Sequence, residues 1–177
     1  IGINAMIALY LGAGDREKAE MAATHGFALS LVHGVVMMAV SIAIMPGFLR
    51  RFTHDEALIA AGITYSTIVF LFSLINMADL AFEKIFQSVG RMNVAMVALI
   101  TGCVCNILLD PVLIFGLGPV PAMGIAGAAL ATALSQLVSF FILGSFFLRK
   151  RSIVRIHMRA VSKSPRVYGH ILLIGLP

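Results

Sequence analysis

Charged residues are scarce in this 177-residue chain: they make up 12% of the sequence, whereas the hydrophobic set makes up 60%. A soluble domain carries about 25% charged residues, so an ordinary soluble domain is excluded. Intrinsic disorder and nucleic-acid binding, which depend on many polar or basic side chains, are excluded as well. Asp, Glu, Lys and Arg are missing entirely from three stretches, 21–49, 57–78 and 111–148. About 20 apolar helical residues cross a bilayer, so the chain is predicted to be a polytopic α-helical membrane protein.

Other patterns are missing too. Residues 29–45 show no alternation of polar and apolar side chains, which excludes a transmembrane β-barrel. Cysteine occurs only as Cys103 and Cys105, which are two residues apart in one expected helix and project from different faces of it. We therefore expect no disulfide bond. With no further Cys and no His at ligand spacing, we expect no structural metal site either.

Turn residues and charges divide the chain into four full spans, near 22–45, 58–82, 94–116 and 124–148. The last two are separated by Gly116-Leu-Gly-Pro-Val-Pro-Ala-Met-Gly124, where the density of Gly and Pro indicates a turn. The apolar segments at the two ends, 1–11 and about 167 onward, are too short to span a bilayer. We interpret the chain as an internal fragment of a longer all-α membrane protein.

The basic residues are distributed unevenly among the loops. Eleven of the thirteen Lys and Arg lie in loops 12–21, 83–93 and 149–166; of the alternate loops, 46–57 holds the other two, Arg50 and Arg51, and 116–123 holds none. Short cytoplasmic loops carry the excess of Lys and Arg, so the first three loops are predicted to be cytoplasmic. The net charge of +5 then reflects topology rather than an acidic partner. Loop 149–166 is also suited to contact anionic lipid headgroups.

Four sequence motifs cover nearly the whole chain: Leu11-Gly-Ala-Gly-Asp-Arg-Glu-Lys-Ala19, Phe82-Glu-Lys-Ile-Phe-Gln-Ser-Val-Gly-Arg91, Asn106-Ile-Leu-Leu-Asp-Pro-Val-Leu-Ile-Phe-Gly116 and Gly124-Ile-Ala-Gly-Ala-Ala-Leu-Ala-Thr132. In this order they resemble the multidrug and toxic compound extrusion (MATE) family of antiporters. The resemblance implies a fold of twelve helices in two pseudo-symmetric six-helix lobes around a central cavity.

The resemblance also implies a division of the chain into three parts. Residues 1–148 correspond to part of the N-terminal lobe, from the end of the family's second helix to its sixth. Residues 149–166 correspond to the cytoplasmic linker between the lobes, and 167–177 to the start of the C-terminal lobe.

Asp110 is the only ionisable residue deep in the 94–148 region. A charge at mid-membrane costs about 2.5–3.5 kcal/mol on insertion scales, so Asp110 is expected to face the bundle interior or a wet cavity. Asn106 lies one turn earlier on the same face, where its amide can ligate a cation or donate to the carboxylate. Pro111 leaves the Ile107 carbonyl without its usual donor, and we expect the helix to be perturbed there.

A third residue is predicted to join this pair. At 1.5 Å per residue, Asp110 and Thr132 lie roughly 9 and 12 Å below the outer ends of adjacent helices, which is a similar depth. In the family that the chain resembles, an Asn, an Asp four residues later and a Thr on the next helix help to bind the coupling cation, with an Asp on the first helix. This implies that Asn106, Asp110 and Thr132 bind H⁺ or Na⁺. The alternative is that Asn106 and Asp110 only brace the lobe.

Further polar residues lie toward the cytoplasmic side. Asp79 and Glu83 are one turn apart near the end of span 58–82, where we expect the membrane interface, and Glu83 and Gln87 are suited to pair with Lys84, Arg91 or the adjoining loop. The motif that contains Glu83 and Gln87 suggests a cytoplasmic gate, to which Asp79 is also assigned; interfacial anchoring is the alternative. His33, near mid-bilayer, and His25 are more readily interpreted as packing residues than as proton relays.

Small residues recur at four-residue steps in span 124–148, in one row through Gly124, Ala128 and Thr132 and a second through Gly127, Ala131 and Ser135. Small side chains let helix backbones approach closely in a membrane, so these rows predict close helix packing rather than substrate contact.

The leading functional hypothesis is a plasma (inner) membrane antiporter, in which H⁺ or Na⁺ drives export of amphipathic, often cationic, drugs and toxic compounds. The expected partners are the bilayer, these small molecules and the rest of the chain, with no nucleic acid and no cofactor beyond the coupling ion. A lipid-linked oligosaccharide flippase of the same fold is the alternative, although the spans contain no Lys or Arg to hold pyrophosphate. An intramembrane enzyme lacks paired aspartates at one depth and a His-Glu-x-x-His motif. A non-transporting scaffold is the remaining alternative.

Overall fold

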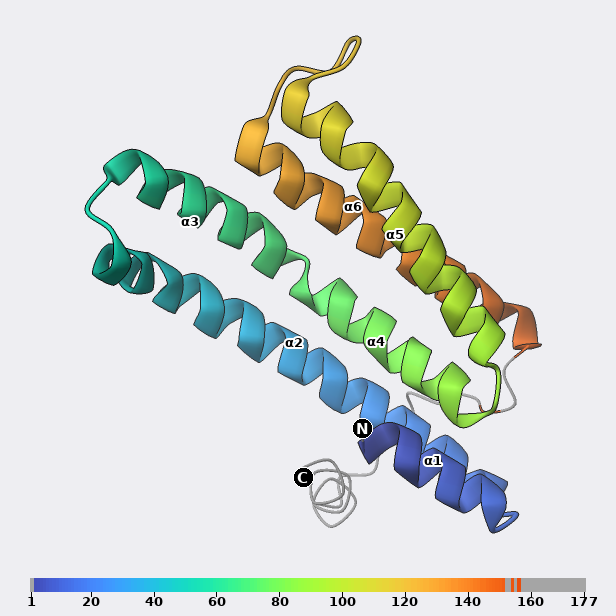
Figure 1. The fold of residues 1–177 in the computed structure, drawn as a ribbon. Helices are drawn as coiled ribbons and strands as arrows, with labels where there is room; N and C mark the ends of the chain where they lie inside the picture. The colour runs from blue at the N-terminus through green and yellow to red at the C-terminus, as the bar shows by residue number, and fades with distance from the viewer. Residues whose placement is uncertain (1, 152–153, 155, 157–177) are drawn as a thin grey trace.

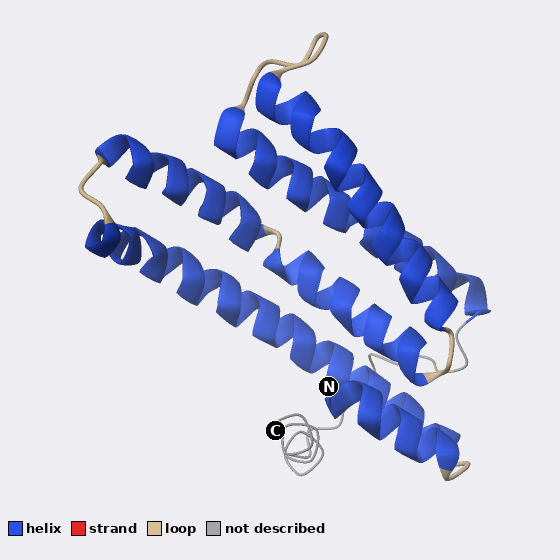
Figure 2. Ribbon diagram, viewed as in Figure 1, coloured by secondary structure: helices blue, strands red, loops and turns tan. Residues whose placement is uncertain are grey.

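The computed structural model describes residues 2–151, 154 and 156, and within these residues every regular element is helical (Figures 1 and 2). Three helices are long and apolar enough to cross a bilayer, and a bent helix pair makes a fourth candidate span. The elements are α1 (Gly2–Gly12), α2 (Arg16–Phe52), α3 (Glu56–Leu71), α4 (Ser73–Ser88), α5 (Met92–Phe115), α6 (Gly124–Phe146) and a π-helical turn, η1 (Phe147–Arg151). The predicted all-α fold is therefore confirmed.

The long helices run up and down, so the connections gather at two ends of the bundle (Figure 1). The α1–α2 and α4–α5 turns lie at the same end as the C-terminus of α6. The α2–α3 and α5–α6 connections lie at the other end. This arrangement groups the loops as the positions of the basic residues predict.

Helix α2 is longer at both ends than the predicted span 22–45. At its start, the Asp15 carboxylate accepts a hydrogen bond from the Lys18 backbone N–H and pairs with the Lys18 ammonium at 2.7 Å. The side-chain and backbone hydrogen bonds from Lys18 lower the pKa of the Asp15 carboxyl below its ordinary value. At the other end the helix passes through Pro46, where the sequence predicts a loop. Continuing the helix keeps the following backbone groups paired, which a lipid environment demands.

The predicted span 58–82 is also wrong in one respect, because it consists of two helices, α3 and α4, bent by 45° at Phe72. No Gly or Pro marks this position. The bend lies against α2, where the Ser73 hydroxyl donates to the Gly34 carbonyl oxygen at 3.2 Å. A Cβ atom at Gly34 would stand 3.2 Å from the Leu74 Cα, so the glycine lets the start of α4 approach α2. The bend therefore depends on a tertiary contact.

Helix α5 continues without a break through Pro111 to Phe115, so the perturbation predicted there is absent from its assigned helical structure. Its partner α6 packs closely along it, and a Cβ atom at Gly127 would overlap the Leu113 carbonyl. Gly116 ends α5 with φ 74°, a backbone conformation that glycine adopts without a steric penalty. The packing prediction is confirmed for one row of small residues, since Gly127, Ala131 and Ser135 are buried.

Buried side chains concentrate near the α1–α2 and α4–α5 turns. Phe82 of α4 contacts Phe27, Phe140 and Phe147, with ring centroids 5.0, 5.8 and 5.2 Å away. His25 is fully buried and its Nδ1 lies 2.7 Å from the Met21 carbonyl oxygen, in keeping with a packing role. His33 is exposed on α2, so it is not buried among the described residues, and its packing role stays a prediction.

Candidate cation site

A polar cavity lies between α4, α5 and α6. Its volume is about 280 Å³, and its floor and walls carry carboxylate, amide and hydroxyl groups together with a few apolar side chains. The polar lining residues are Asn76, Asp79, Glu83, Asn106, Thr132, Ser135, Gln136 and Ser139. Carboxylate, amide and hydroxyl oxygens are the groups that bind hard cations in proteins.

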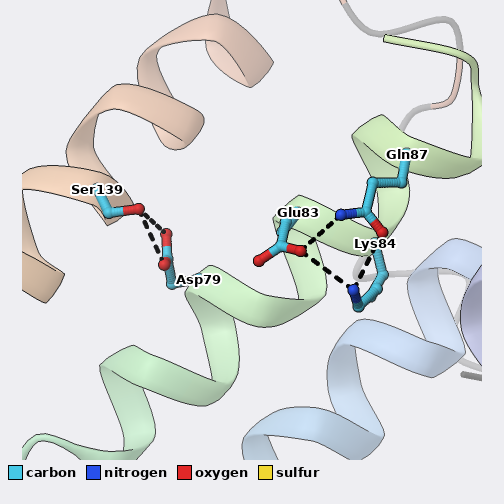
Figure 3. Close-up of polar contacts among 5 residues, drawn as sticks. All are labelled: Asp79, Glu83, Lys84, Gln87 and Ser139. Carbon is cyan, nitrogen blue, oxygen red and sulfur yellow. Dashed lines mark hydrogen bonds and ion pairs between the residues drawn. The ribbon is translucent and has the colours of Figure 1, made fainter. Parts of the chain in front are cut away.

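Asp79 projects from α4 toward α6, where it meets Ser139 (Figure 3). The Ser139 hydroxyl lies 3.2 Å from Oδ1 and 3.0 Å from Oδ2 of the carboxylate. Both residues are at least partly buried, and the described residues place no basic group in ion-pair contact with Asp79. The sequence predicts Asp79 near the end of a span, but α4 continues to Ser88 and makes it a mid-helix residue.

Glu83, one turn along α4, has a different environment (Figure 3). Its Oε1 accepts hydrogen bonds from the Lys84 ammonium at 3.1 Å and from the Gln87 amide nitrogen at 2.6 Å. Lys84 also donates to the Gln87 side-chain oxygen at 3.0 Å. The expected pairing of Glu83 with Lys84 and Gln87 is present, so its charge is balanced within α4.

Asn106 and Asp110 lie on α5, one turn apart. The Asn106 Nδ2 is buried and has no hydrogen-bond partner within the described part of the chain. Asp110 is partly buried, and no hydrogen bond or ion pair joins its side chain to another described residue. Asp110 does not line the cavity that contains Asn106.

Thr132 lines the same cavity as Asn106, on the opposing helix α6. Its hydroxyl donates to the Ala128 carbonyl oxygen at 3.0 Å, and the Ser135 hydroxyl donates to the Thr132 carbonyl oxygen at 2.8 Å. Both hydroxyl protons are thus used within α6, which leaves the hydroxyl oxygens as acceptors. Of the predicted trio, the cavity brings together Asn106 and Thr132, and it adds Asp79, Glu83 and Ser139.

The two cysteines are free: Cys103 is exposed and Cys105 is partly buried. Among the described residues, no group of three or more His, Cys, Asp and Glu side chains is arranged to hold a metal ion.

Comparison with known proteins decides the family. The MatE family model matches residues 1–112, which is more than half of the chain. The chain belongs to the MATE family. Members of this family are transporters rather than enzymes, and they are multi-pass proteins of the plasma membrane.

Relatives of this MATE chain match it over its full length. It is 27% identical over 179 residues to the multidrug export protein MepA of Staphylococcus saprophyticus, and covers 38% of that protein. It superposes on a multidrug resistance MATE transporter in an inward-facing conformation with a TM-score of 0.91, 31% identity and coverage of 100% of this chain and 40% of the other. For an outward-facing structure the TM-score is 0.89, with 31% identity and coverage of 99% and 38%. The chain thus spans about two-fifths of the length of these relatives.

Proposed function

We propose that this chain forms part of the N-terminal lobe of an antiporter in which inward flow of H⁺ or Na⁺ drives the export of amphipathic, often cationic, small molecules. The observation that carries the proposal is that the Asp110 carboxylate and the Asn106 amide lie one turn apart on α5 without fixed side-chain partners in the described part of the chain. Neither Asp110 nor the buried Asn106 nitrogen has a side-chain partner among the described residues. An intramembrane ionisable residue without a fixed partner is suited to exchange a proton or a cation.

Each group has a distinct role in this proposal. Asp110 supplies the negative charge that binds H⁺ or Na⁺, Asn106 supports it one turn away, and Thr132 contributes an oxygen from α6. Glu83 and Gln87 belong to the cytoplasmic side of the lobe, where the Glu83–Gln87 contact serves as a gate contact, whereas Asp79 lies in the middle of α4.

Coupling requires that the ion bind one conformation of the transporter more tightly than another, because equal affinity for both states shifts no equilibrium. The two comparisons with solved conformations support a rigid-lobe version of this cycle. The same chain superposes almost equally well on an inward-facing and an outward-facing transporter, with TM-scores of 0.91 and 0.89. This is expected when a lobe keeps its internal packing while the two repeats rock around a central site.

The proposal is tested with the complete open reading frame that contains this sequence, purified and reconstituted into vesicles loaded with a fluorescent lipophilic cation. Efflux is recorded with an imposed proton gradient, with an imposed Na⁺ gradient and with neither. We expect one of the two gradients, or both, to accelerate efflux, and a protonophore to remove the proton-driven part. Equal efflux rates under all three conditions would contradict ion-coupled antiport.

A further inference from the structure

We propose that Asp79 and Ser139 form a second binding position for a small monovalent cation, a proton or Na⁺, in the cavity between α4 and α6. This position is distinct from Asp110, which does not line the cavity. The inference rests on the proposed function only in that a transporter of this kind uses the bound ion. The binding itself is argued from charge, hydrogen bonding and cavity size.

The charge on Asp79 is not balanced by the described part of the chain. An ionised carboxylate has about four acceptor sites, but a single hydroxyl, that of Ser139, donates to Asp79. One proton cannot serve both oxygens at the same time, although Ser139 lies within 3.2 Å of each. A partly buried carboxylate with no cationic partner is costly, and binding a proton or a metal cation removes that cost.

The neighbouring carboxylate, that of Glu83, has the positively charged partner that Asp79 lacks among the described residues. Glu83 lines the same cavity one turn away, but the Lys84 ammonium lies 3.1 Å from it and the Gln87 amide also donates to it. Glu83 is therefore satisfied without a bound ion. Asp79 is the carboxylate of the pair that lacks a fixed positive charge.

The other charged and titratable groups around the cavity are few. The lining residues of α4 supply Asp79 and Glu83, those of α5 supply the Cys103 thiol, and those of α6 supply no titratable side chain. Helices α1, α2 and α3 also pack against α4, but none of their residues lines the cavity. No lining group therefore competes with an incoming cation for Asp79.

Oxygen atoms suited to a small cation line the same cavity as the carboxylate. The hydroxyls of Thr132 and Ser135 donate hydrogen bonds to carbonyl oxygens of α6, so the hydroxyl oxygens remain available as ligands. The amides of Asn76 and Gln136 line the same space. Hard monovalent and divalent cations are bound by this kind of oxygen set, in contrast to the thiolate and imidazole sets that hold transition metals.

The cavity has room for a small cation. Its 280 Å³ is several times the roughly 30 Å³ that one water occupies in the liquid, so a cation with some of its hydration shell fits. The carboxylate, amide and hydroxyl groups of the lining give such a cation oxygen ligands within this space.

Occupancy of this position bears on helix packing, because the Asp79–Ser139 contact joins α4 to α6. A proton on Asp79 turns one acceptor oxygen into a donor, and Na⁺ draws the carboxylate oxygens toward itself. Either event changes the one described side-chain hydrogen bond between these two helices.

Binding is tested on the purified complete protein in detergent, without any transport assay. Radioactive Na⁺ binding is measured by scintillation proximity, and the infrared band of protonated carboxyl groups is followed as a function of pH. The variants are Asp79→Asn and Ser139→Ala. The matched controls are Asp55→Asn, which keeps an N-cap residue on α3, and Ser145→Ala, which removes an exposed α6 hydroxyl bonded to the Ile142 carbonyl.

If Na⁺ is the ligand, Asp79→Asn loses one equivalent of saturable Na⁺ binding relative to the parent, and Ser139→Ala weakens that binding by about tenfold, or ~1.4 kcal/mol. If the proton is the ligand, Asp79→Asn loses one titrating carboxyl band. Ser139→Ala then increases the proton affinity of that group by roughly tenfold, because a donated hydrogen bond stabilises the ionised form. Ser145→Ala matches the parent in either case, and Asp55→Asn matches it in Na⁺ binding.

The inference is overturned if Asp79→Asn keeps the parental Na⁺ stoichiometry and the carboxyl titration of Ser139→Ala also matches that of the parent. Asp110→Asn serves as the comparison. If the two positions are separate, the Asp110→Asn protein keeps the binding signal that depends on Asp79. Failure of the proposed function gives a different result. In that case the parent protein still shows Asp79-dependent ion binding, but its efflux does not respond to an ion gradient. Thermal melting of each variant excludes misfolding, and Ser139→Ala provides a second readout if Asp79→Asn is unstable.

Discussion

The side-chain amide nitrogen of Asn106 is buried but donates no hydrogen bond to a described residue, which is rare for a buried polar group. Its Nδ2 has no hydrogen-bond partner among the described residues. Leaving such a group unsatisfied costs about 1–3 kcal/mol. A residue that only braced α5 against α6 would be expected to make the bond that this amide lacks. The missing bond therefore speaks against bracing of α5 by this amide nitrogen within the described residues.

Replacing Asn106 distinguishes the ion-site hypothesis from the bracing alternative. We expect Asn106→Ala to leave the thermal unfolding midpoint of the complete protein unchanged or raised, because it removes an unsatisfied buried donor, while ion-coupled efflux is weakened. The control is Asn93→Ala, which changes an exposed residue of the same helix. The bracing hypothesis gains support if Asn106→Ala lowers the midpoint well below that of the control while coupling is preserved.

The sequence predicts part of the site at this scale. Equal depth on antiparallel helices predicts that Asp110, Asn106 and Thr132 lie together; Asn106 and Thr132 line one cavity, whereas Asp110 does not line it. The Asp79–Ser139 contact was not predicted, because it joins residues 60 positions apart and depends on how α4 packs against α6. The predicted span also ended too early, at residue 82, which made Asp79 look like an interfacial residue.

The lengths of the apolar segments and the turn residues predict which helices exist better than they predict where each helix begins and ends. The turn at 116–123 is where the Gly and Pro residues predict it, between α5 and α6. Pro46 does not end α2 and Pro111 does not break α5, whereas the unmarked Phe72 separates α3 from α4. A proline signals lost hydrogen bonding, but whether the chain bends there is decided by the helices packed against it.

The contact between α5 and α6 depends on the absence of a side chain at Gly127. We expect Gly127→Ala to destabilise the protein by about 1–3 kcal/mol, since its Cβ would overlap the Leu113 carbonyl, a backbone group that cannot rotate away. Gly144→Ala is the matched control on the same helix, because a Cβ there meets nothing within 4 Å. Thermal melting in detergent compares the two. Equal melting midpoints for the two variants would show that the α5–α6 contact is looser than the structure indicates.

For the molecule as a whole, the connections divide between two ends, and the basic residues follow that division. Loops 12–21, 83–93 and 149–166 are predicted to be cytoplasmic from their eleven Lys and Arg. Most of the last loop lies outside the described residues, so its predicted linker role rests on the sequence alone. The start of a second lobe at 167–177 lies outside them as well.

Cysteine labelling tests the orientation. In a complete protein with both native cysteines replaced by Ala, we expect Ser152→Cys to resist a membrane-impermeant thiol reagent in intact cells and to react after permeabilisation. Gly118→Cys, at the opposite end of the bundle, should react in intact cells. Rapid external labelling of Ser152→Cys with protection of Gly118→Cys would reverse the topology.

The central claim is that a carboxylate of this lobe couples ion movement to export, and Asp110→Asn tests it most directly. The amide keeps the shape of the side chain but cannot carry the charge that binds H⁺ or Na⁺, and it inserts into the membrane more cheaply than a carboxylate. Efflux of a fluorescent cation from energised vesicles is measured for parent and variant at equal detergent-solubilised yield. We predict normal yield and loss of the response to the ion gradient. Export at the parental rate with an unchanged gradient response would show that Asp110 is a bracing residue and contradict the claim.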